Sequence, residues 1–189
     1  NSISEGDIVF VLQENISKSF SGFKDRHTTV KSKDGENFTI NLGSHLEGNV
    51  TLDNVTVDKS NNFFAEGYTF ETTENFSGKF TGIVYGGSDK NDVANTNLVL
   101  KAGTYENVYG GGLDKNVTED VNITIDGANA GNLFGGGHAV SSSNGKVGKD
   151  VNLNLRSGIA RSFFGGGNNE HTTKTDRTPA AVSGTVYLT

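Results

Sequence analysis

The chain contains no cysteine, methionine or tryptophan, and only one proline among its 189 residues. The absence of cysteine excludes disulfide bonds and thiolate metal sites together. No run of 18 apolar residues occurs, so the sequence offers no candidate for a membrane-spanning helix, and we expect no membrane insertion. The formal net charge is −6 and the basic residues are scattered. Because a phosphate backbone attracts basic surfaces, we expect no nucleic-acid partner.

Glycine, in contrast, is abundant, and much of it follows a repeated aromatic residue. The copies are "IVYGGSDKND" (83–92), "NVYGGGLDKN" (107–116), "NLFGGGHAVS" (132–141) and "SFFGGGNNEH" (162–171). The aromatic residue moves from Tyr85 to Tyr109, Phe134 and Phe164, in steps of 24, 25 and 30 residues. The variation in length falls in the loops after the glycines. Constant segments joined by loops of variable length are typical of a solenoid.

Each glycine run is preceded by a segment in which apolar and polar residues alternate. Val121, Ile123 and Ile125 would point to one side of a strand, and Asn122 and Thr124 to the other. Such alternation predicts a strand with one dry face. Equivalent strands would stack in parallel, and parallel strands need a crossover, which further strands and loops supply. An antiparallel sandwich is the alternative, but it predicts tight hairpins in place of a repeating unit.

The first 80 residues carry a looser version of the same pattern. Strands are predicted at 7–12, 28–33, 38–43 and 50–57, and "NFFAEG" (62–67) puts Phe64 in the place of Tyr85. We therefore predict an all-β fold: one right-handed parallel β-helix of about six to seven coils. Residues 1–80 would form irregular coils and residues 81–189 regular ones, and we expect the chain to be a segment of a larger protein.

Two columns of equivalent residues are candidate surfaces. The aromatic column comprises Phe64, Tyr85, Tyr109, Phe134 and Phe164, and we expect it to lie outward or at a corner. Stacked rings would stabilise the solenoid by their own contacts, and an outward column would offer platforms for sugar rings. The second column aligns Asn97, Asn122, Asn152 and Thr185. Amides at that spacing predict hydrogen-bonded ladders along the axis, with polymer binding as the alternative.

The loops that follow the glycines carry oxygen-bearing side chains. Asp89, Asn91 and Asp92 lie in one loop, and Asp114, Asn116, Glu119 and Asp120 in the next. Ca²⁺ takes six to eight oxygen ligands. Neither loop has the twelve-residue order of an EF-hand, so solvated loop polarity is the favoured interpretation. We predict no cofactor, with Ca²⁺ at these loops as the alternative.

The sequence gives little indication of catalysis. His27, His45, His138 and His171 lie on separate coils or loops, and none has the spacing of a zinc-protease motif. Polysaccharide-cleaving enzymes need paired acids, or Ca²⁺ with a basic group, in one cleft. No acid pair is placed to work with Arg156 and Arg161. We therefore predict that the chain is not an enzyme.

The glycine motifs from "NFFAEG" to "SFFGGG" resemble the glycine-rich β-helical regions of large cell-surface proteins of Gram-positive bacteria. Those regions are similar to the right-handed β-helix of pectate lyases without its active site. The resemblance covers most of the chain and is strongest over 60–189. It implies an extracellular, wall-attached protein, but it defines no functional residue that can be transferred to this sequence.

From these observations we predict a non-catalytic cell-surface module for adhesion or carbohydrate binding. Its partners would be a host or plant glycan or an extracellular-matrix protein, together with adjacent domains of the same surface protein. A structural stalk and a polysaccharide lyase or hydrolase are the alternatives. The expected ligand contacts flank the glycine corners: Tyr85, Tyr109, Asp114, His138 and Asn168.

Overall fold

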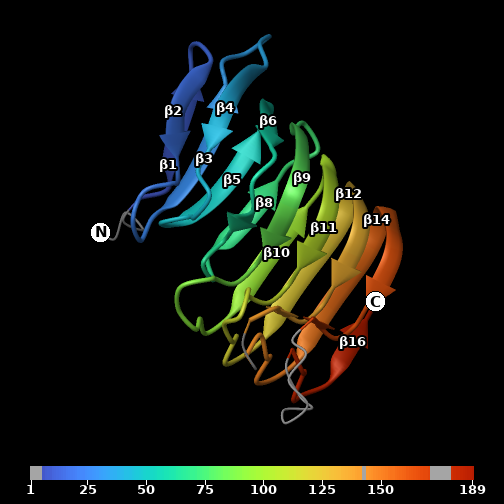
Figure 1. The fold of residues 1–189 in the computed structure, drawn as a ribbon. Helices are drawn as coiled ribbons and strands as arrows, with labels where there is room; N and C mark the ends of the chain where they lie inside the picture. Colours follow the sequence, from blue (N-terminus) through green and yellow to red (C-terminus); the bar gives the residue numbers. More distant parts are fainter. Residues whose placement is uncertain (1–5, 142–143, 171–179) are drawn as a thin grey trace.

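The computed structural model describes residues 6–141, 144–170 and 180–189, and these residues contain strands but no helix (Figure 1). The strands are β1 (Ile8–Leu12), β2 (Ile16–Phe20), β3 (His27–Ser32), β4 (Phe38–Leu42), β5 (Asn49–Asp53), β6 (Val55–Lys59), β7 (Phe63–Phe64), β8 (Thr69–Thr72), β9 (Ser77–Tyr85), β10 (Thr96–Leu100), β11 (Thr104–Tyr109), β12 (Val121–Phe134), β13 (His138–Ala139), β14 (Val151–Phe164), β15 (Asn168–Asn169) and β16 (Val186–Leu188).

All the strands except β13 and β15 form one large sheet that is curled nearly into a barrel, and all the strand pairs within it are parallel (Figure 1). Its strand order is β1-β3-β5-β8-β10-β12-β11-β9-β6-β4-β2. The chain therefore alternates between two opposite sides of the curled sheet. The long strands β12 and β14 bend from one side to the other, and β12 pairs with both β10 and β11. This β-solenoid-like arrangement confirms the parallel prediction and excludes an antiparallel sandwich.

Equivalent residues of successive repeats lie side by side. Asn97 pairs with Asn122, and Asn122 with Asn152, so the alignment of the regular repeats is confirmed. The last strand differs from the prediction. Tyr187, and not Thr185, lies opposite Asn152. The residue of this last strand that pairs with Asn152 is therefore two positions later in the sequence than expected.

The N-terminal strands also agree with the sequence pattern, with two differences. The predicted strand over 50–57 is two strands, β5 and β6, divided at Asn54, whose φ of 48° is left-handed. Asn tolerates that conformation better than most residues, and its Nδ2 donates a hydrogen bond of 2.8 Å to the Glu36 carbonyl. Strand β2 was not predicted, because the alternation of "ISKSF" places apolar residues only at its two ends.

The interior is filled by the alternating apolar residues, as predicted. In the regular repeats it holds aliphatic side chains such as Leu98, Ile123 and Leu133, which are fully buried. In the earlier strands it holds rings: Phe63 and Phe70 lie with centroids 4.7 Å apart, and both contact Phe80. One dry interior therefore runs through both parts, and in the earlier strands aliphatic side chains such as Val30 and Leu52 accompany the rings.

The glycine runs are explained by how closely the repeats approach one another at that corner. A Cβ on Gly135 would lie 2.4 Å from the Gly165 carbonyl oxygen and 2.6 Å from Val151 Cγ1. The backbone of Gly135 meanwhile donates a hydrogen bond of 2.8 Å to the Phe164 carbonyl. No side chain fits there without moving backbone atoms, so the corner requires glycine.

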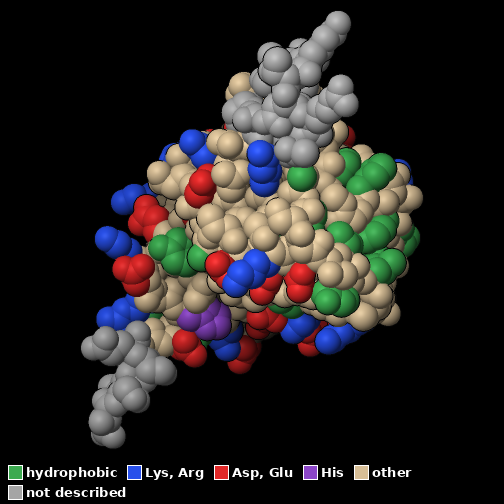
Figure 2. Space-filling view, turned by 90° about the horizontal axis from the view of Figure 1, so that it is seen from below, with side chains coloured by type: hydrophobic (Ala, Val, Ile, Leu, Met, Phe, Trp, Pro, Cys, Tyr) green, Lys and Arg blue, Asp and Glu red, His purple; other side chains and the backbone are tan. Residues whose placement is uncertain are grey.

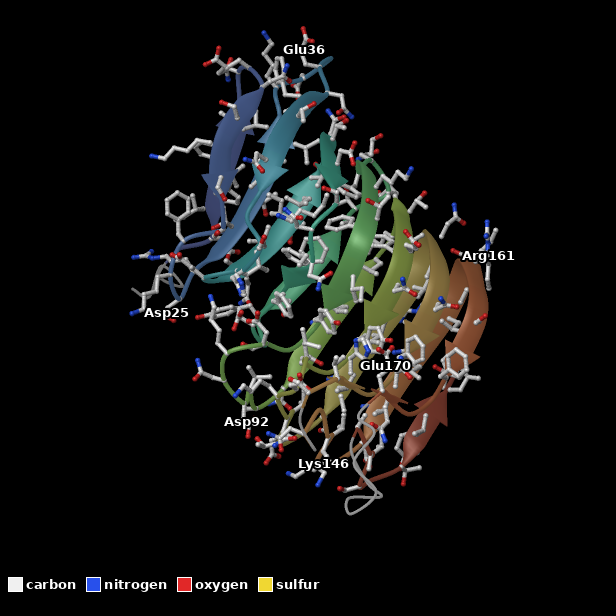
Figure 3. The ribbon with its side chains drawn as sticks, viewed as in Figure 1. Asp25, Glu36, Asp92, Lys146, Arg161 and Glu170 are labelled. Carbon is white, nitrogen blue, oxygen red and sulfur yellow. The ribbon has the colours of Figure 1, made fainter. Side chains whose placement is uncertain are left out.

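Apolar side chains are gathered at the C-terminal end of the stack. Figure 2 shows hydrophobic side chains on the side where β14 and β16 lie, and the exposed ones on these strands include Phe164, Val186, Tyr187 and Leu188. Charged residues lie mostly on loops and outer strand faces, as the labelled Asp92, Lys146 and Arg161 illustrate (Figure 3).

Candidate functional site

The aromatic column forms a continuous stack of rings at the glycine corner. Successive centroids from Phe64 to Phe164 are 4.8, 5.3, 4.3 and 4.6 Å apart, with nearly parallel planes. Phe64, Tyr85 and Tyr109 are buried in a cluster separate from the main interior. The column therefore lies at a corner and stabilises the stack by ring contacts, as expected. Neither face of Tyr85 or Tyr109 is open to a sugar ring.

The five predicted contact residues converge around this stack. The Tyr85 hydroxyl lies 2.9 Å from His138 Nδ1, and Asn168 Nδ2 donates a hydrogen bond of 3.2 Å to the Tyr109 hydroxyl. His138 and Asn168 pair in the small parallel sheet β13-β15. The Asp114 carboxylate accepts the backbone N–H groups of residues 140 and 141, and its own N–H donates to the His138 carbonyl. Together they hold adjacent loops against the ring stack.

The protonation states in this network follow from burial. Burial raises the pKa of the Tyr85 hydroxyl well above its usual value and also raises the pKa of the Tyr109 hydroxyl, so both stay neutral hydrogen-bonding groups. The buried His138 places Nε2 3.1 Å from Glu170 Oε1 but is poorly aligned for a hydrogen bond. Ligand contact at these positions stays a prediction, and His171 lies outside the described residues.

The acidic loops use many of their oxygens within the protein. Asp92 Oδ1 accepts a hydrogen bond of 2.8 Å from the Asn116 backbone N–H. Asp120 Oδ1 likewise accepts a hydrogen bond from the backbone N–H of Asp150, and Asp150 Oδ1 accepts one from the backbone N–H of Thr185. Each carboxylate thus joins one repeat to the next. The expected amide ladder is present in part, because Asn152 Nδ2 donates to Asn122 Oδ1 at 3.0 Å, whereas Asn122 Nδ2 donates to the Thr96 carbonyl.

One group of possible metal ligands brings together residues from three repeats. His45 Nδ1 lies 2.5 Å from Glu66 Oε1 and 3.7 Å from Asp89 Oδ1. All three ligand atoms lie within 4.8 Å of one another. A cavity of about 480 Å³ adjoins them, and its lining includes His45, Glu66, Lys24, Tyr68 and Lys90.

This group was missed because His45 and Glu66 occupy columns that the regular repeats fill with other residues. Leu46 N–H donates to the Phe64 carbonyl, and Ala65 N–H donates to that of Tyr85. "HLEG" (45–48) is therefore aligned with "FAEG" (64–67), and His45 is a member of the aromatic column. Its ring stacks on Phe64 with centroids 5.0 Å apart. The shared Glu-Gly at the end of both segments was the signal in the sequence.

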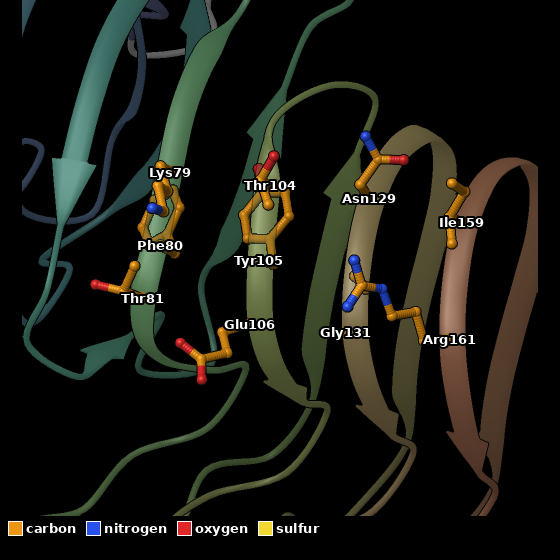
Figure 4. A pocket seen from close by; sticks show the side chains of 11 residues that line it. Lys79, Phe80, Thr81, Thr104, Tyr105, Glu106, Asn129, Gly131, Ile159 and Arg161 are labelled. Carbon is orange, nitrogen blue, oxygen red and sulfur yellow. The ribbon is translucent and has the colours of Figure 1, made fainter.

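A groove crosses the outer face of β9, β11, β12 and β14 (Figure 4). Its volume is about 430 Å³. Strand pairing places Lys79, Thr104, Asn129 and Ile159 in one row across the strands. A second row contains Glu106 and Arg161, with Gly131 between them (Figure 4). Because a Cβ on Gly131 would lie 2.4 Å from the Glu106 carbonyl oxygen, this position has no room for a side chain and the groove stays open.

The chemistry of the groove suits binding. Its charged residues are one carboxylate, Glu106, and two cations, Lys79 and Arg161. Most glycoside hydrolases use a pair of carboxyl groups, and the lining of this groove contains one carboxylate. Ile159, which is 56% exposed, adds an apolar surface between the polar groups.

The chain matches no protein-family model, no curated protein and no solved structure. Among the described residues, no helix has the length and apolar character needed to cross a membrane.

Proposed function

We propose that the chain is a right-handed β-helix of about six to seven coils that acts as a non-catalytic binding module for glycans. Right-handed crossovers are the rule for parallel strands, and the repeating parallel pairs support a coiled arrangement. The resemblance of the glycine motifs to Gram-positive surface proteins supports a place on a bacterial cell wall, in adhesion. Adjacent domains of the same surface protein would then hold it there.

The groove across β9, β11, β12 and β14 is the observation that carries this proposal. Ligand sites are concave, and those for small molecules typically measure about 300–1,000 Å³; this groove lies within that range. It runs across successive strands, so a linear polymer lying along the stack would meet an equivalent position every ~4.8 Å.

The residues of the groove suit a sugar polymer. Arg161 and Lys79 offer several N–H donors, Glu106 offers acceptors, and Thr104 and Asn129 offer both. Sugar hydroxyls need such mixed partners, and Ile159 can cover an apolar sugar face. Most of these side chains are exposed on the outer strand face, so a ligand can reach them without any rearrangement of the stack.

A glycan array tests the proposal with a pair of matched arginine variants on β14. Arg161→Ala removes a donor from the groove, whereas Arg156→Ala removes an exposed arginine that lines a different, smaller hollow. We expect retained glycans to be lost with Arg161→Ala and Glu106→Gln and kept with Arg156→Ala. No retention by the wild-type protein would favour the structural stalk. New reducing ends or unsaturated products would favour the lyase or hydrolase.

The same array tests the five predicted contacts. Asn168→Ala removes a half-buried side chain that bonds Tyr109 and lies next to the corner loops. If glycans bind at the corner and not in the groove, Asn168→Ala reduces retention and Arg161→Ala leaves it unchanged. The two locations are thereby distinguished by one experiment.

A further inference from the structure

His45, Glu66 and Asp89 are aimed at a common point from three segments of the chain. Their ligand atoms lie within 4.8 Å of one another. Asp89 Oδ1 is fully buried and has no hydrogen-bond partner among the described residues, although other atoms of this side chain reach solvent. A buried carboxylate oxygen without a donor is unfavourable unless a cation or donor faces it. This oxygen faces His45 at a distance too long for a hydrogen bond.

The three side chains are held in place by the surrounding stack. The His45 ring is fixed by stacking on Phe64, with an interplanar angle of 11°. The backbone N–H of Glu66 donates to the Gly87 carbonyl. Ser88 is fully buried, and its hydroxyl accepts the backbone N–H groups of Lys90 and Asn91, which fixes the turn that carries Asp89. Ligands held in advance of binding lose little freedom when an ion arrives.

We infer that His45, Glu66 and Asp89 form a binding site for one divalent transition-metal ion, with Zn²⁺ as its representative. Imidazole nitrogen is a ligand for zinc and its first-row neighbours, whereas Ca²⁺ and Mg²⁺ select oxygen ligands. The site therefore differs in chemistry from a Ca²⁺ site in the acidic loops. The adjoining cavity leaves room for water to complete the coordination.

The geometry requires only small movements. Zinc lies about 2.0–2.2 Å from nitrogen and oxygen ligands, which puts neighbouring ligand atoms roughly 3 Å apart. The observed separations of 2.5 and 3.7 Å lie on either side of that value. The His45 Nδ1–Glu66 Oε1 hydrogen bond would be replaced by two bonds to the ion, and a neutral His45 ring would then carry its hydrogen on Nε2.

Charges around the site are mixed. Glu47 lines the same cavity and adds a third carboxylate, while Lys24 and Lys90 supply two cations. With a neutral imidazole, the two carboxylate ligands carry two negative charges, which match a divalent ion.

Zinc titration of the chelator-stripped protein tests the site. Calorimetry should show one Zn²⁺ per chain, and elemental analysis after dialysis should give the same stoichiometry. His45→Phe keeps a ring on Phe64 and removes the nitrogen, and Asp89→Asn keeps the shape and removes the charge. Each should weaken Zn²⁺ binding at least about tenfold. Even the replacement of residues that contact a metal's ligands, and not the metal itself, lowers metal affinity about 10–100-fold.

Asp92→Asn is the matched control, because Asp92 lies in the same loop and bonds Asn116 instead. It should bind Zn²⁺ like the wild type. Equal binding by wild type, His45→Phe and Asp89→Asn would overturn the site, as would Ca²⁺ binding tighter than Zn²⁺. Far-ultraviolet circular dichroism checks that each variant folds. If His45→Phe does not fold, the Zn²⁺ affinity of Asp89→Asn decides the test. Arg161→Ala should leave Zn²⁺ binding unchanged, which separates this site from the glycan groove.

Discussion

Residues 96–164 and residues 8–72 build the same parallel stack with different side chains at equivalent positions. At the corner of the regular part, the position after each aromatic residue is glycine, and so is the next. At the same corner of the earlier part these positions are Ala65 and Glu66. The N–H groups of Glu66, Gly87, Gly111 and Gly136 all donate to the next repeat in the same way. The backbone pattern is thus kept while the side chains change.

The difference shows where a repeating fold has room for chemistry. Identical repeats make identical contacts, so a glycine column or an amide ladder places the same side chains in the same contacts in every repeat. Where the earlier part departs from that column, His45 and Glu66 bring a nitrogen and a carboxylate to the end of the aromatic stack. The regular part stabilises the stack, and the departures from it carry two of the three candidate metal ligands.

The largest effect is expected in the interior of the earlier part. Phe70 is fully buried and packs against Phe63 and Phe80. Phe70→Ala would leave a cavity that neighbouring rings cannot fill, at a cost of about 3–5 kcal/mol in the free energy of unfolding. Urea denaturation measures it, with Phe23→Ala, at a 42% exposed ring, as control. Similar losses for the two variants would show that the ring cluster is not the core of this part.

The glycine column of the regular part gives the next effect. A Cβ on Gly136 would lie 2.5 Å from the Gly167 nitrogen, whereas one on Gly166 meets no described atom within 4 Å. The two glycines are equivalent members of successive runs. We expect Gly136→Ala to lower stability by about 1–3 kcal/mol, as overpacking does, and Gly166→Ala to change it little. Thermal unfolding of both variants checks this, and equal stabilities would mean that close approach is not what requires glycine.

The sequence predicted the stack well where its pattern is local. Alternation identified the strands of the repeats, and their spacing identified the parallel register of Asn97, Asn122 and Asn152. The break at Asn54 was missed because a single left-handed residue leaves the alternation of 50–57 unchanged. The register of Thr185 was wrong because the preceding loop is longer than in other repeats, and its length carries no information on where the next strand begins.

The candidate sites were harder to predict, because they depend on residues from several repeats. Tyr85 and His138 are 53 residues apart and yet share a hydrogen bond. His45, Glu66 and Asp89 come together only when the two Glu-Gly segments are placed in register with the glycine runs. The groove depends on which residues of β9, β11, β12 and β14 point outward, and alternation alone does not show where the surface is hollow.

A second amide ladder, of one step, joins β11 and β12, and it should contribute a smaller effect, measurable by a double-mutant cycle. Asn132 Nδ2 donates a hydrogen bond of 2.8 Å to Asn107 Oδ1. Hydrogen bonds contribute about 0.5–1.5 kcal/mol net, so Asn107→Ala and Asn132→Ala should show a coupling energy near 1 kcal/mol. Asn91→Ala combined with Asn132→Ala should be additive, because Asn91 lies in a loop and is not part of this ladder. A coupling energy of zero for the first pair would remove the ladder as a source of stability.

The smallest effect concerns the backbone at Glu66, where the earlier part has a side chain in a glycine column. Its φ is 57°, a left-handed conformation that costs an L-residue about 1–2 kcal/mol. Glu66→Ala and Glu66→Gly both remove the carboxylate, so their difference isolates the backbone. Glycine loses more freedom on folding, which offsets part of the gain. In the presence of chelator, we expect Glu66→Gly to be more stable than Glu66→Ala by about 0.5–1 kcal/mol in urea denaturation.

Glu106 provides the control, because it is a glutamate that lies within strand β11, where it is exposed, whereas Glu66 is half-buried. There glycine weakens the strand, so Glu106→Gly should be less stable than Glu106→Ala by roughly 0.5–1 kcal/mol. The order of the two variants is therefore expected to reverse between the sites. If alanine were the better residue at both, the strain at Glu66 would be too small to matter. The reversal would show that this part of the stack accepts a strained backbone to hold a carboxylate beside His45.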